Sequence, residues 1–329
     1  MSTAFVFPGQ GSQSIGMLAA LASQYDDVQK VFASASQRLG YDLWALTQDG
    51  PQERLNSTEC TQPAMLAAGV ATWRIWQRRG GPLPDLVAGH SLGEFTALAV
   101  AGALDPDDAI ELVRFRGQVM QEAVPRGEGG MAAIIGLDDA EVEAACAEAA
   151  QGEVVEAVNY NAPSQVVIAG ATAAVERAGA AAKARGAKRA LPLPVSAPFH
   201  SSLMRPAAER LRERLASVRL QRPTIRFVSS VDGRDYADPE TIRELLYRQL
   251  ASAVRWTTTI RALADGGVTR FVECGPGKVL TGLNRRIDKR PGLECLAVDD
   301  PATLDAALAA LSGELAGTAT AGGDTGAAA

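Results

Sequence analysis

Short apolar runs alternate along this chain with longer segments in which apolar residues recur every three or four positions. The short runs predict buried strands at residues 3–7, 85–88, 225–230, 269–273 and 294–298. The longer segments predict helices at residues 64–79, 107–124, 202–217 and 238–250. This alternation predicts an α/β fold of the hydrolase-like kind, a parallel sheet with flanking helices. Ligands bind such sheets beyond the carboxyl ends of the strands.

The middle of the chain has a different order of elements. Strand patterns lie at residues 130–136, 154–160, 165–169 and 188–193, with helix patterns at 138–150 and 172–185. The order strand-helix-strand-strand-helix-strand is that of a ferredoxin-like unit. We therefore expect a ferredoxin-like small domain over residues 126–196, inserted into a discontinuous α/β catalytic domain of residues 1–125 and 197–315. Residues 316–329 are mostly Ala, Gly and Thr, and predict a disordered tail.

Composition narrows the class of protein. The 329 residues are 47% apolar and 21% charged, which is typical of a globular protein. A net charge of -6 argues against a nucleic-acid partner. The four cysteines lack metal-ligand spacing, so we expect no metal site and a reducing compartment. The sequence shows no signal peptide and no apolar stretch of about 20 residues, so we expect a cytoplasmic protein without a membrane span.

Candidate chemistry begins with residues 89–93, which read Gly-His-Ser-Leu-Gly. They fit G-x-S-x-G, the pattern of a nucleophilic serine on a sharp strand-to-helix turn. A predicted strand precedes the motif and an Ala- and Leu-rich helix follows it, as the pattern requires. A serine hydroxyl needs a base, and the chain has only two histidines. His90 adjoins Ser91 and should point to the opposite face, which leaves His200 as the expected base of Ser91.

Acyl transfer through a serine also needs two hydrogen-bond donors for the developing oxyanion. In G-x-S-x-G proteins one donor is the backbone N–H of the residue after the nucleophile, here Leu92. The second donor comes from a neighbouring loop at a strand end. The glycine-rich loop after the first strand contains Gln10 and is of that kind. We therefore expect Gln10 and Leu92 to flank the reacting carbonyl.

Arg116 is the most informative charged residue. It falls on the apolar stripe of the helix predicted at 107–124, whereas Arg114 falls on the polar face. A buried arginine needs a partner of opposite charge, or desolvation makes it costly. That partner is either Glu94, just beyond the nucleophile, or the carboxylate of a substrate held by both arms of the guanidinium. Both assignments hold if Glu94 pairs with Arg116 only while no substrate carboxylate is bound.

Four motifs in order carry a family resemblance. Residues 7–13 (FPGQGSQ), 61–64 (TQPA), 89–94 (GHSLGE) and 275–278 (GPGK) resemble the malonyl-CoA:acyl-carrier-protein transacylases. The resemblance implies that Ser91 takes a malonyl group from malonyl-CoA and passes it to the phosphopantetheine thiol of acyl carrier protein. It implies that His200 is the general base, that Arg116 binds the malonyl carboxylate, and that Gln10 and Leu92 form the oxyanion hole. By the same resemblance, the main chain of Gln249 holds the histidine.

The resemblance further implies an enzyme of fatty-acid synthesis that uses no cofactor, and we expect a monomer. Phe199 precedes the histidine, and phenylalanine there accompanies malonyl selection in related polyketide enzymes. Three alternatives remain: a malonyltransferase of a polyketide or malonate decarboxylase system, a serine thioester hydrolase, and a non-catalytic module that docks carrier protein. A hydrolase would not need a buried arginine, and a docking module would not need Ser91, His200 and Arg116 together.

Overall fold

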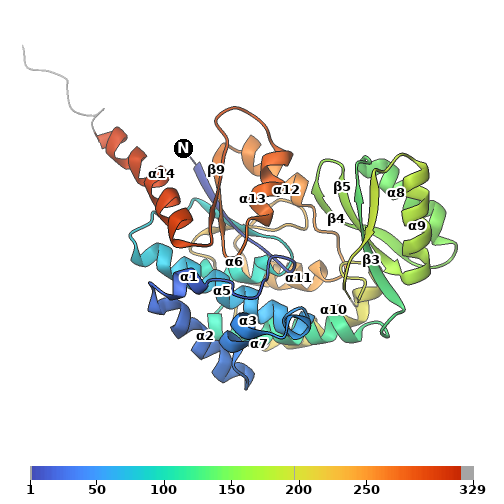
Figure 1. Cartoon of the computed structure of the whole chain (residues 1–329), viewed down its shortest axis with the longest axis horizontal. Helices are drawn as coiled ribbons and strands as arrows, with labels where there is room; N and C mark the ends of the chain where they lie inside the picture. Colours follow the sequence, from blue (N-terminus) through green and yellow to red (C-terminus); the bar gives the residue numbers. More distant parts are fainter. Residues whose placement is uncertain (1, 196, 320–329) are drawn as a thin grey trace, which may run out of the picture.

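A six-stranded sheet runs through the larger part of the molecule in the computed structural model, which describes residues 2–195 and 197–319 (Figure 1). The strand order is β10-β9-β1-β2-β7-β8, and all neighbours are parallel except β7 and β8. The strands are β1 (Ser2–Phe7), β2 (Leu86–Gly89), β7 (Arg226–Val228), β8 (Asp235–Tyr236), β9 (Val268–Cys274) and β10 (Glu294–Val298). All five predicted strands are present, and the short β8 is the one that the sequence did not predict.

Helices cover both faces of this sheet because alternate residues of the buried strands point to opposite sides. Phe5 on β1 packs edge-on against Trp73 and Trp76, whereas Ala4 and Val6 belong to a second core on the other face. The larger core contains residues of α2 (Asp26–Leu39), α5 (Thr58–Arg78), α6 (Gly93–Val100), α7 (Pro106–Glu122), α10 (Arg205–Ala216) and α11 (Pro239–Gln249). The smaller core lies under α12 (Trp256–Asp265) and α13 (Val279–Ile287). The predicted fold class is confirmed.

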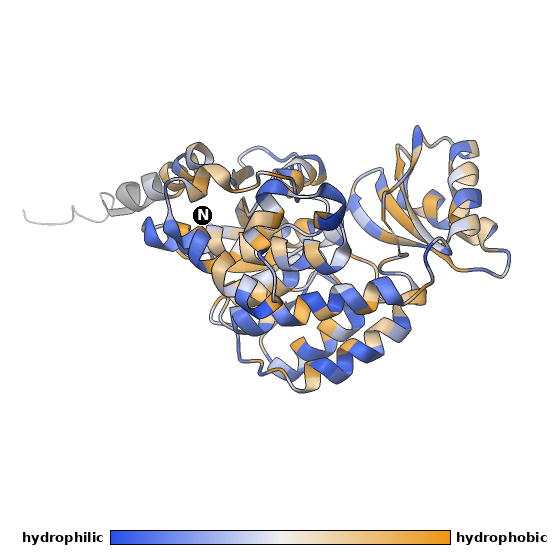
Figure 2. Ribbon diagram, turned by 60° about the horizontal axis from the view of Figure 1, so that its bottom comes forward, coloured by the Kyte–Doolittle hydropathy of each residue, from blue (hydrophilic) through white to orange (hydrophobic). Residues whose placement is uncertain are grey.

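A second, antiparallel sheet forms a smaller body at the right of Figure 1. Its order is β4-β5-β3-β6, from β3 (Gly129–Ile135), β4 (Val155–Ala162), β5 (Gln165–Ala171) and β6 (Arg189–Pro192). Apolar residues of α8 (Asp139–Ala150) and α9 (Thr172–Ala184) pack on one face of it, and Figure 2 shows the hydrophobic side of these helices turned towards the strands. The chain order of these six elements is the one that the sequence predicted.

The remaining helices in the described residues are four short ones and the longer α14. They are α1 (Ala19–Ala22), α3 (Leu43–Asp49), α4 (Gln52–Leu55), the 3₁₀ helix η1 (Ser202–Met204) and α14 (Pro301–Ala319). The segment expected to be a disordered tail begins at residue 316, and α14 continues through residues 316–319 of it. Residues 320–329, the rest of that predicted tail, and residue 196, the predicted end of the insert, lie outside the described residues. None of the described helices combines the length and apolarity that crossing a bilayer requires.

The turn from β2 to α6 is compact enough to require two glycines. A Cβ on Gly89 would lie 1.9 Å from the carbonyl carbon of Gly93, and a Cβ on Gly93 would lie 2.0 Å from the carbonyl oxygen of Phe7. Both obstructing atoms belong to the backbone, so they move only if β1 or α6 moves. The two glycines therefore set how closely α6 approaches the sheet.

We expect Gly89→Ala to destabilise the protein by at least about 2 kcal/mol, because the added methyl group overpacks a backbone contact. Gly282→Ala is the matched control, since a Cβ there meets nothing within 4 Å and the residue lies inside α13. That change should stabilise the fold by about 0.5–1 kcal/mol through lower backbone entropy in the unfolded chain. Thermal unfolding of both variants measures the difference, and equal melting temperatures would contradict the packing argument.

Candidate active site

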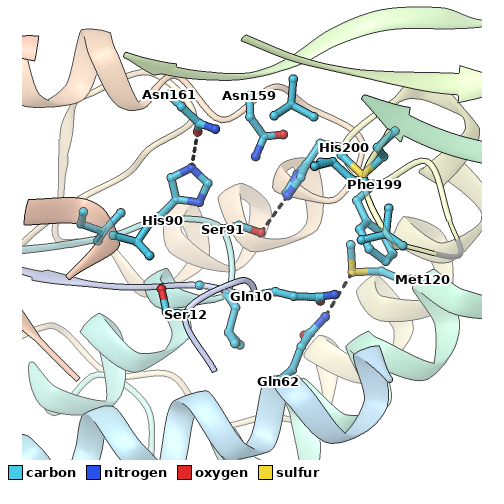
Figure 3. A pocket seen from close by; sticks show the side chains of 18 of the residues that line it. Gln10, Ser12, Gln62, His90, Ser91, Met120, Asn159, Asn161, Phe199 and His200 are labelled. Carbon is cyan, nitrogen blue, oxygen red and sulfur yellow. Dashed lines mark hydrogen bonds between the residues drawn. The ribbon is translucent and has the colours of Figure 1, made fainter. Parts of the chain in front are cut away.

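Ser91 lies at the tip of the turn between β2 and α6, with a backbone φ of +52°. A non-glycine residue in this left-handed region is strained, and the surrounding packing must hold it there. The close approach of Gly89 and Gly93 supplies that packing. The result is a serine whose Oγ projects into a cavity beyond the carboxyl ends of β1 and β2, as the strand-turn-helix pattern predicts (Figure 3).

His200 approaches Ser91 from a separate segment. Its Nε2 lies 2.7 Å from Ser91 Oγ, and its Nδ1 lies 2.9 Å from the main-chain oxygen of Gln249. A carbonyl oxygen only accepts, so Nδ1 carries the proton and the lone pair of Nε2 faces the serine hydroxyl. Burial and the positive charge of Arg116 lower the pKa of His200 to about 3. The imidazole is therefore neutral at physiological pH and able to accept a proton.

Arg116 is buried on α7, as its place on the apolar stripe predicts. Its guanidinium donates to Gln62 Oε1 at 2.9 Å, to Gln249 Oε1 at 2.8 Å and to Ser91 Oγ at 3.2 Å. Its Nε has no hydrogen-bond partner among the described residues. Burial lowers the pKa of Arg116 to about 9, an effect that the charge of Glu94 opposes, so the guanidinium stays positive at neutral pH. A cation with unused donors thus lies beside the nucleophile.

Glu94 is not the direct partner of Arg116, although the sequence left that pairing open. Both carboxylate oxygens of Glu94 accept from N–H groups instead, one from the Ser230 backbone and one from the Gln249 side chain. The hydroxyl of Ser229 donates to the same carboxylate at 2.9 Å. Burial raises the pKa of Glu94, and these donors oppose that rise by favouring the ionised form. The amide of Gln249 therefore stands between the two charges, accepting from Arg116 and donating to Glu94.

The nucleophile opens into a cavity of about 190 Å³. Loops and helices of the larger body line it, including Gln10, Leu92 and Arg116, and strands of the small sheet complete the lining. Gln249 lies behind this lining. Within the described residues, the backbone N–H groups of Gln10 and Leu92 donate to no protein acceptor. Two free donors beside a serine are what a developing oxyanion needs. The structure thus brings together all six residues that the sequence selected.

His90 takes no part in the contacts of Ser91, as expected from its place next to the serine. Its Nε2 donates to Asn161 Oδ1 at 2.8 Å, and its ring packs edge-on against Trp256. Burial lowers the pKa of His90. No group of His, Cys, Asp and Glu side chains in the described part of the chain could hold a metal ion.

Sequence reasoning missed several polar residues of the cavity. The motif at residues 61–64 gives Gln62 no role, and the apolar patterns place Asn159 in a strand and Asn161 in the loop after it. The signal available for the asparagines was their i, i+2 spacing in a segment otherwise rich in apolar residues. Figure 3 shows Asn161 above His90, its hydrogen-bond partner, and Asn159 above Ser91.

Comparison with known proteins identifies the family of this chain. The model of the acyl transferase domain family matches residues 4–298. The malonyl CoA-acyl carrier protein transacylase of Salmonella typhimurium is 57% identical over 305 residues, which cover 93% of this chain and 98% of that protein.

Two solved structures are similar over nearly their whole length. The crystal structure of an acyl carrier protein S-malonyltransferase from Vibrio cholerae is 57% identical, with a TM-score of 0.90 and coverage of 93% of this chain and 99% of that chain. A malonyl-transacylase in complex with a type II polyketide acyl carrier protein is 54% identical, with a TM-score of 0.92 and coverage of 94% and 99%. This chain belongs to the malonyl CoA-acyl carrier protein transacylases, within the acyl transferase domain family.

Proposed function

We propose that this protein transfers malonyl groups from malonyl-CoA to the phosphopantetheine thiol of acyl carrier protein, for fatty-acid synthesis. The observation that carries the proposal is the contact of a buried, positively charged arginine with the nucleophilic serine. Arg116 lies 3.2 Å from Ser91 Oγ, so an acyl group on that oxygen would present its far end to the guanidinium. A terminal carboxylate distinguishes malonyl from acetyl, and a fixed cation is what selects it.

The first half-reaction acylates the serine. His200 Nε2 takes the hydroxyl proton as Ser91 Oγ attacks the thioester carbonyl of malonyl-CoA. The carbonyl oxygen becomes an oxyanion, which the N–H groups of Gln10 and Leu92 stabilise. When the carbon–sulfur bond breaks, the imidazolium returns its proton to the departing thiolate. Free coenzyme A leaves, and malonyl stays as an ester on Ser91.

The second half-reaction runs the same steps in reverse with a different thiol. His200 takes the proton of the phosphopantetheine thiol, and the sulfur attacks the malonyl ester. Collapse of the oxyanion breaks the ester bond, and His200 returns the proton to Ser91 Oγ. Every proton and electron pair is accounted for by the side chains and the two thiols, so the proposal includes no cofactor.

Arg116 does more than hold the malonyl group. Its positive charge is one cause of the low pKa of His200. A bound malonyl carboxylate would neutralise that charge and make the imidazole a stronger base. Binding of the correct acyl group would thus activate the base that attacks it, whereas acetyl would leave His200 weakly basic. The enzyme would then select malonyl over acetyl through the rate of acylation as well as through affinity.

Two further expectations belong to this proposal. We propose that residues 126–196 act as a separate unit that covers the cavity, with the rest of the described chain up to residue 315 as the catalytic body. We also propose a cytoplasmic location, which the reduced state of the cysteines supports. Cys60, Cys146, Cys274 and Cys295 are all free thiols and buried.

We expect the purified protein to gain a single malonyl group when it is incubated with malonyl-CoA, and Ser91→Ala to gain none. Intact mass spectrometry measures the adduct. In the absence of carrier protein the adduct should persist, because a transferase excludes water from its acyl-enzyme. Labelling of Ser91→Ala would reject the nucleophile, and rapid release of free malonate would favour the thioester hydrolase instead.

Arg116→Ala should lower kcat/KM for malonyl-CoA by roughly 30- to 4,000-fold, since removing one partner of a buried charge pair costs about 2–5 kcal/mol. The rate with acetyl-CoA should hold or rise, because the acetyl group has no carboxylate for Arg116 to bind. Arg116→Lys should recover only part of the malonyl rate, as an ammonium cannot make two parallel bonds. Equal losses with both acyl donors would mean that Arg116 supports the fold or Gln249 and is not the source of selectivity.

The acylation rate at limiting malonyl-CoA should not depend on pH between about pH 5 and pH 8. A free histidine titrates near pH 6.5, so it would lose its neutral, basic form as the pH falls from 8 to 5. In this site the pKa is lowered to about 3, so the neutral base is fully present above pH 5 and is lost only as the pH falls towards 3. Rapid-quench measurement of adduct formation at limiting malonyl-CoA, which reports the unliganded site, tests this. An inflection near pH 6.5 in kcat/KM would show that His200 is far less desolvated than its burial implies.

A further inference from the structure

His200 lies on a tight turn at residues 197–201, just before η1. Its backbone φ is +66°, a conformation that its surroundings must hold in place. Within the turn, the Pro198 carbonyl accepts from the Ser201 hydroxyl at 2.7 Å and from the Ser201 N–H at 3.3 Å. The direction of the imidazole therefore depends on what fixes the two ends of this turn.

Glu156 of β4 fixes the end of the turn that follows His200. Its Oε2 accepts from the Ser202 N–H at 2.7 Å, and its Oε1 accepts from the Ser202 hydroxyl at 2.8 Å. Ser202 begins η1, and Ser201 in front of it provides no side-chain cap for the free N–H groups of this helix. Glu156 supplies that cap from the small sheet. Among the described residues, Ser202 is its only hydrogen-bond partner.

The small sheet also touches the end of the turn that precedes His200. Pro198 packs against Gly129 of β3, where an added Cβ would lie 2.4 Å from Pro198 Cδ. Glycine at this position lets the strand approach the turn closely. The strands β3 and β4 lie on either side of β5, so they reach the two ends of the same turn. The turn is thus held at Pro198 by packing and at Ser202 by a carboxylate.

We propose that Glu156 is a positioning residue for catalysis, through which the small sheet holds the imidazole of His200 in line with Ser91 Oγ. This inference rests on the proposed function, because it names what orients the base of that reaction. The Gln249 carbonyl accepts from His200 Nδ1 at 2.9 Å. That bond fixes one atom of the ring and leaves the ring plane free to turn about it. The hold on Ser202, two residues along the backbone, supplies the second constraint.

Loss of this hold would change the environment of the imidazole. Burial is the largest cause that lowers the pKa of His200 to about 3, and the charges of Arg116 and His90 act in the same direction. A turn released at Ser202 would admit water to the ring, so the cost of desolvation would fall. The pKa of His200 should then rise towards its ordinary value near 6.5. The ring would become protonated, and would cease to act as a base, as the pH falls through that raised value.

The titration of His200 can be read without any substrate. The chain has only two histidines, so ring-nitrogen NMR of protein labelled with ¹⁵N-histidine gives few signals, and His200→Gln assigns those of His200 by removing them. In the wild type the ring should stay neutral between about pH 5 and pH 8, whereas in Glu156→Ala it should titrate within that range. Glu156→Gln should resemble the wild type, because its amide can accept from the Ser202 N–H and donate to the Ser202 hydroxyl.

Glu153→Ala is the matched control. It removes a carboxylate from the same part of the small domain and breaks a 2.6 Å bond to Arg177, but Glu153 forms no hydrogen bond with the His200 turn. Its His200 signals should match those of the wild type. An unchanged titration in Glu156→Ala, or the same shift in both alanine variants, overturns the proposal. If Glu156→Ala does not fold, Glu156→Asp replaces it and the same outcomes decide, since the shorter side chain cannot reach both donors of Ser202.

Kinetics separate this role from that of Arg116. In Glu156→Ala, the second-order rates of Ser91 acylation by malonyl-CoA and by acetyl-CoA should both fall by about 10- to 100-fold, because the base serves every acyl donor. A loss confined to malonyl-CoA overturns the proposal, since Glu156 would then act on the acyl pocket. The proposed function fails separately: a wild type that forms no malonyl adduct, but whose His200 responds to Glu156→Ala as expected, would reject malonyl transfer and retain the positioning of His200.

Discussion

The site depends on one glutamine that contacts four other components. The main-chain oxygen of Gln249 accepts from His200, its side-chain oxygen accepts from Arg116, and its side-chain nitrogen donates to the Ser91 carbonyl at 2.9 Å and to Glu94. The base, the cation and the nucleophile turn therefore share one positioning residue. The amide also separates two buried opposite charges. A directly paired arginine would have to break that pair before it bound a substrate carboxylate, whereas an arginine compensated through an amide keeps donors available.

Backbone strain and burial act together around the nucleophile. Ser91 and His200 both lie in the left-handed region, with φ of +52° and +66°. Close backbone contacts of Gly89 and Gly93 hold Ser91 in this conformation. The hydrogen bond to Gln249 orients the ring of His200. Both conformations cost energy, and the surrounding core supplies the packing that keeps them populated. The same burial keeps the imidazole neutral, so the strain and the protonation state have a common origin in dense packing.

The sequence by itself determined those features that depend on local periodicity and residue chemistry. Short apolar runs located the strands of the main sheet other than β8, and the order of strand and helix patterns indicated the small sheet. A period-3.6 pattern located the buried face of α7 that contains Arg116. The glycine spacing around Ser91 predicted a sharp turn. Glycine is needed at 89 and 93 because backbone atoms lie within 2 Å of where a Cβ would be. The scarcity of histidines then pointed to His200. The role of Gln249 came only from family resemblance, since no local pattern marks it.

Only the tertiary structure decided which of these side chains meet, because the contacts join residues far apart in the chain. Arg116 has no direct contact with Glu94, and it donates instead to Gln62 on α5 and Gln249 on α11. No periodicity encodes how α5, α7 and α11 pack against one another. Likewise, the sequence showed Asn159 as one more residue of a strand. Two bulges in β4 and its pairing with Val254 turn that residue into the wall of a cavity, and both depend on how the small sheet rests on the large one.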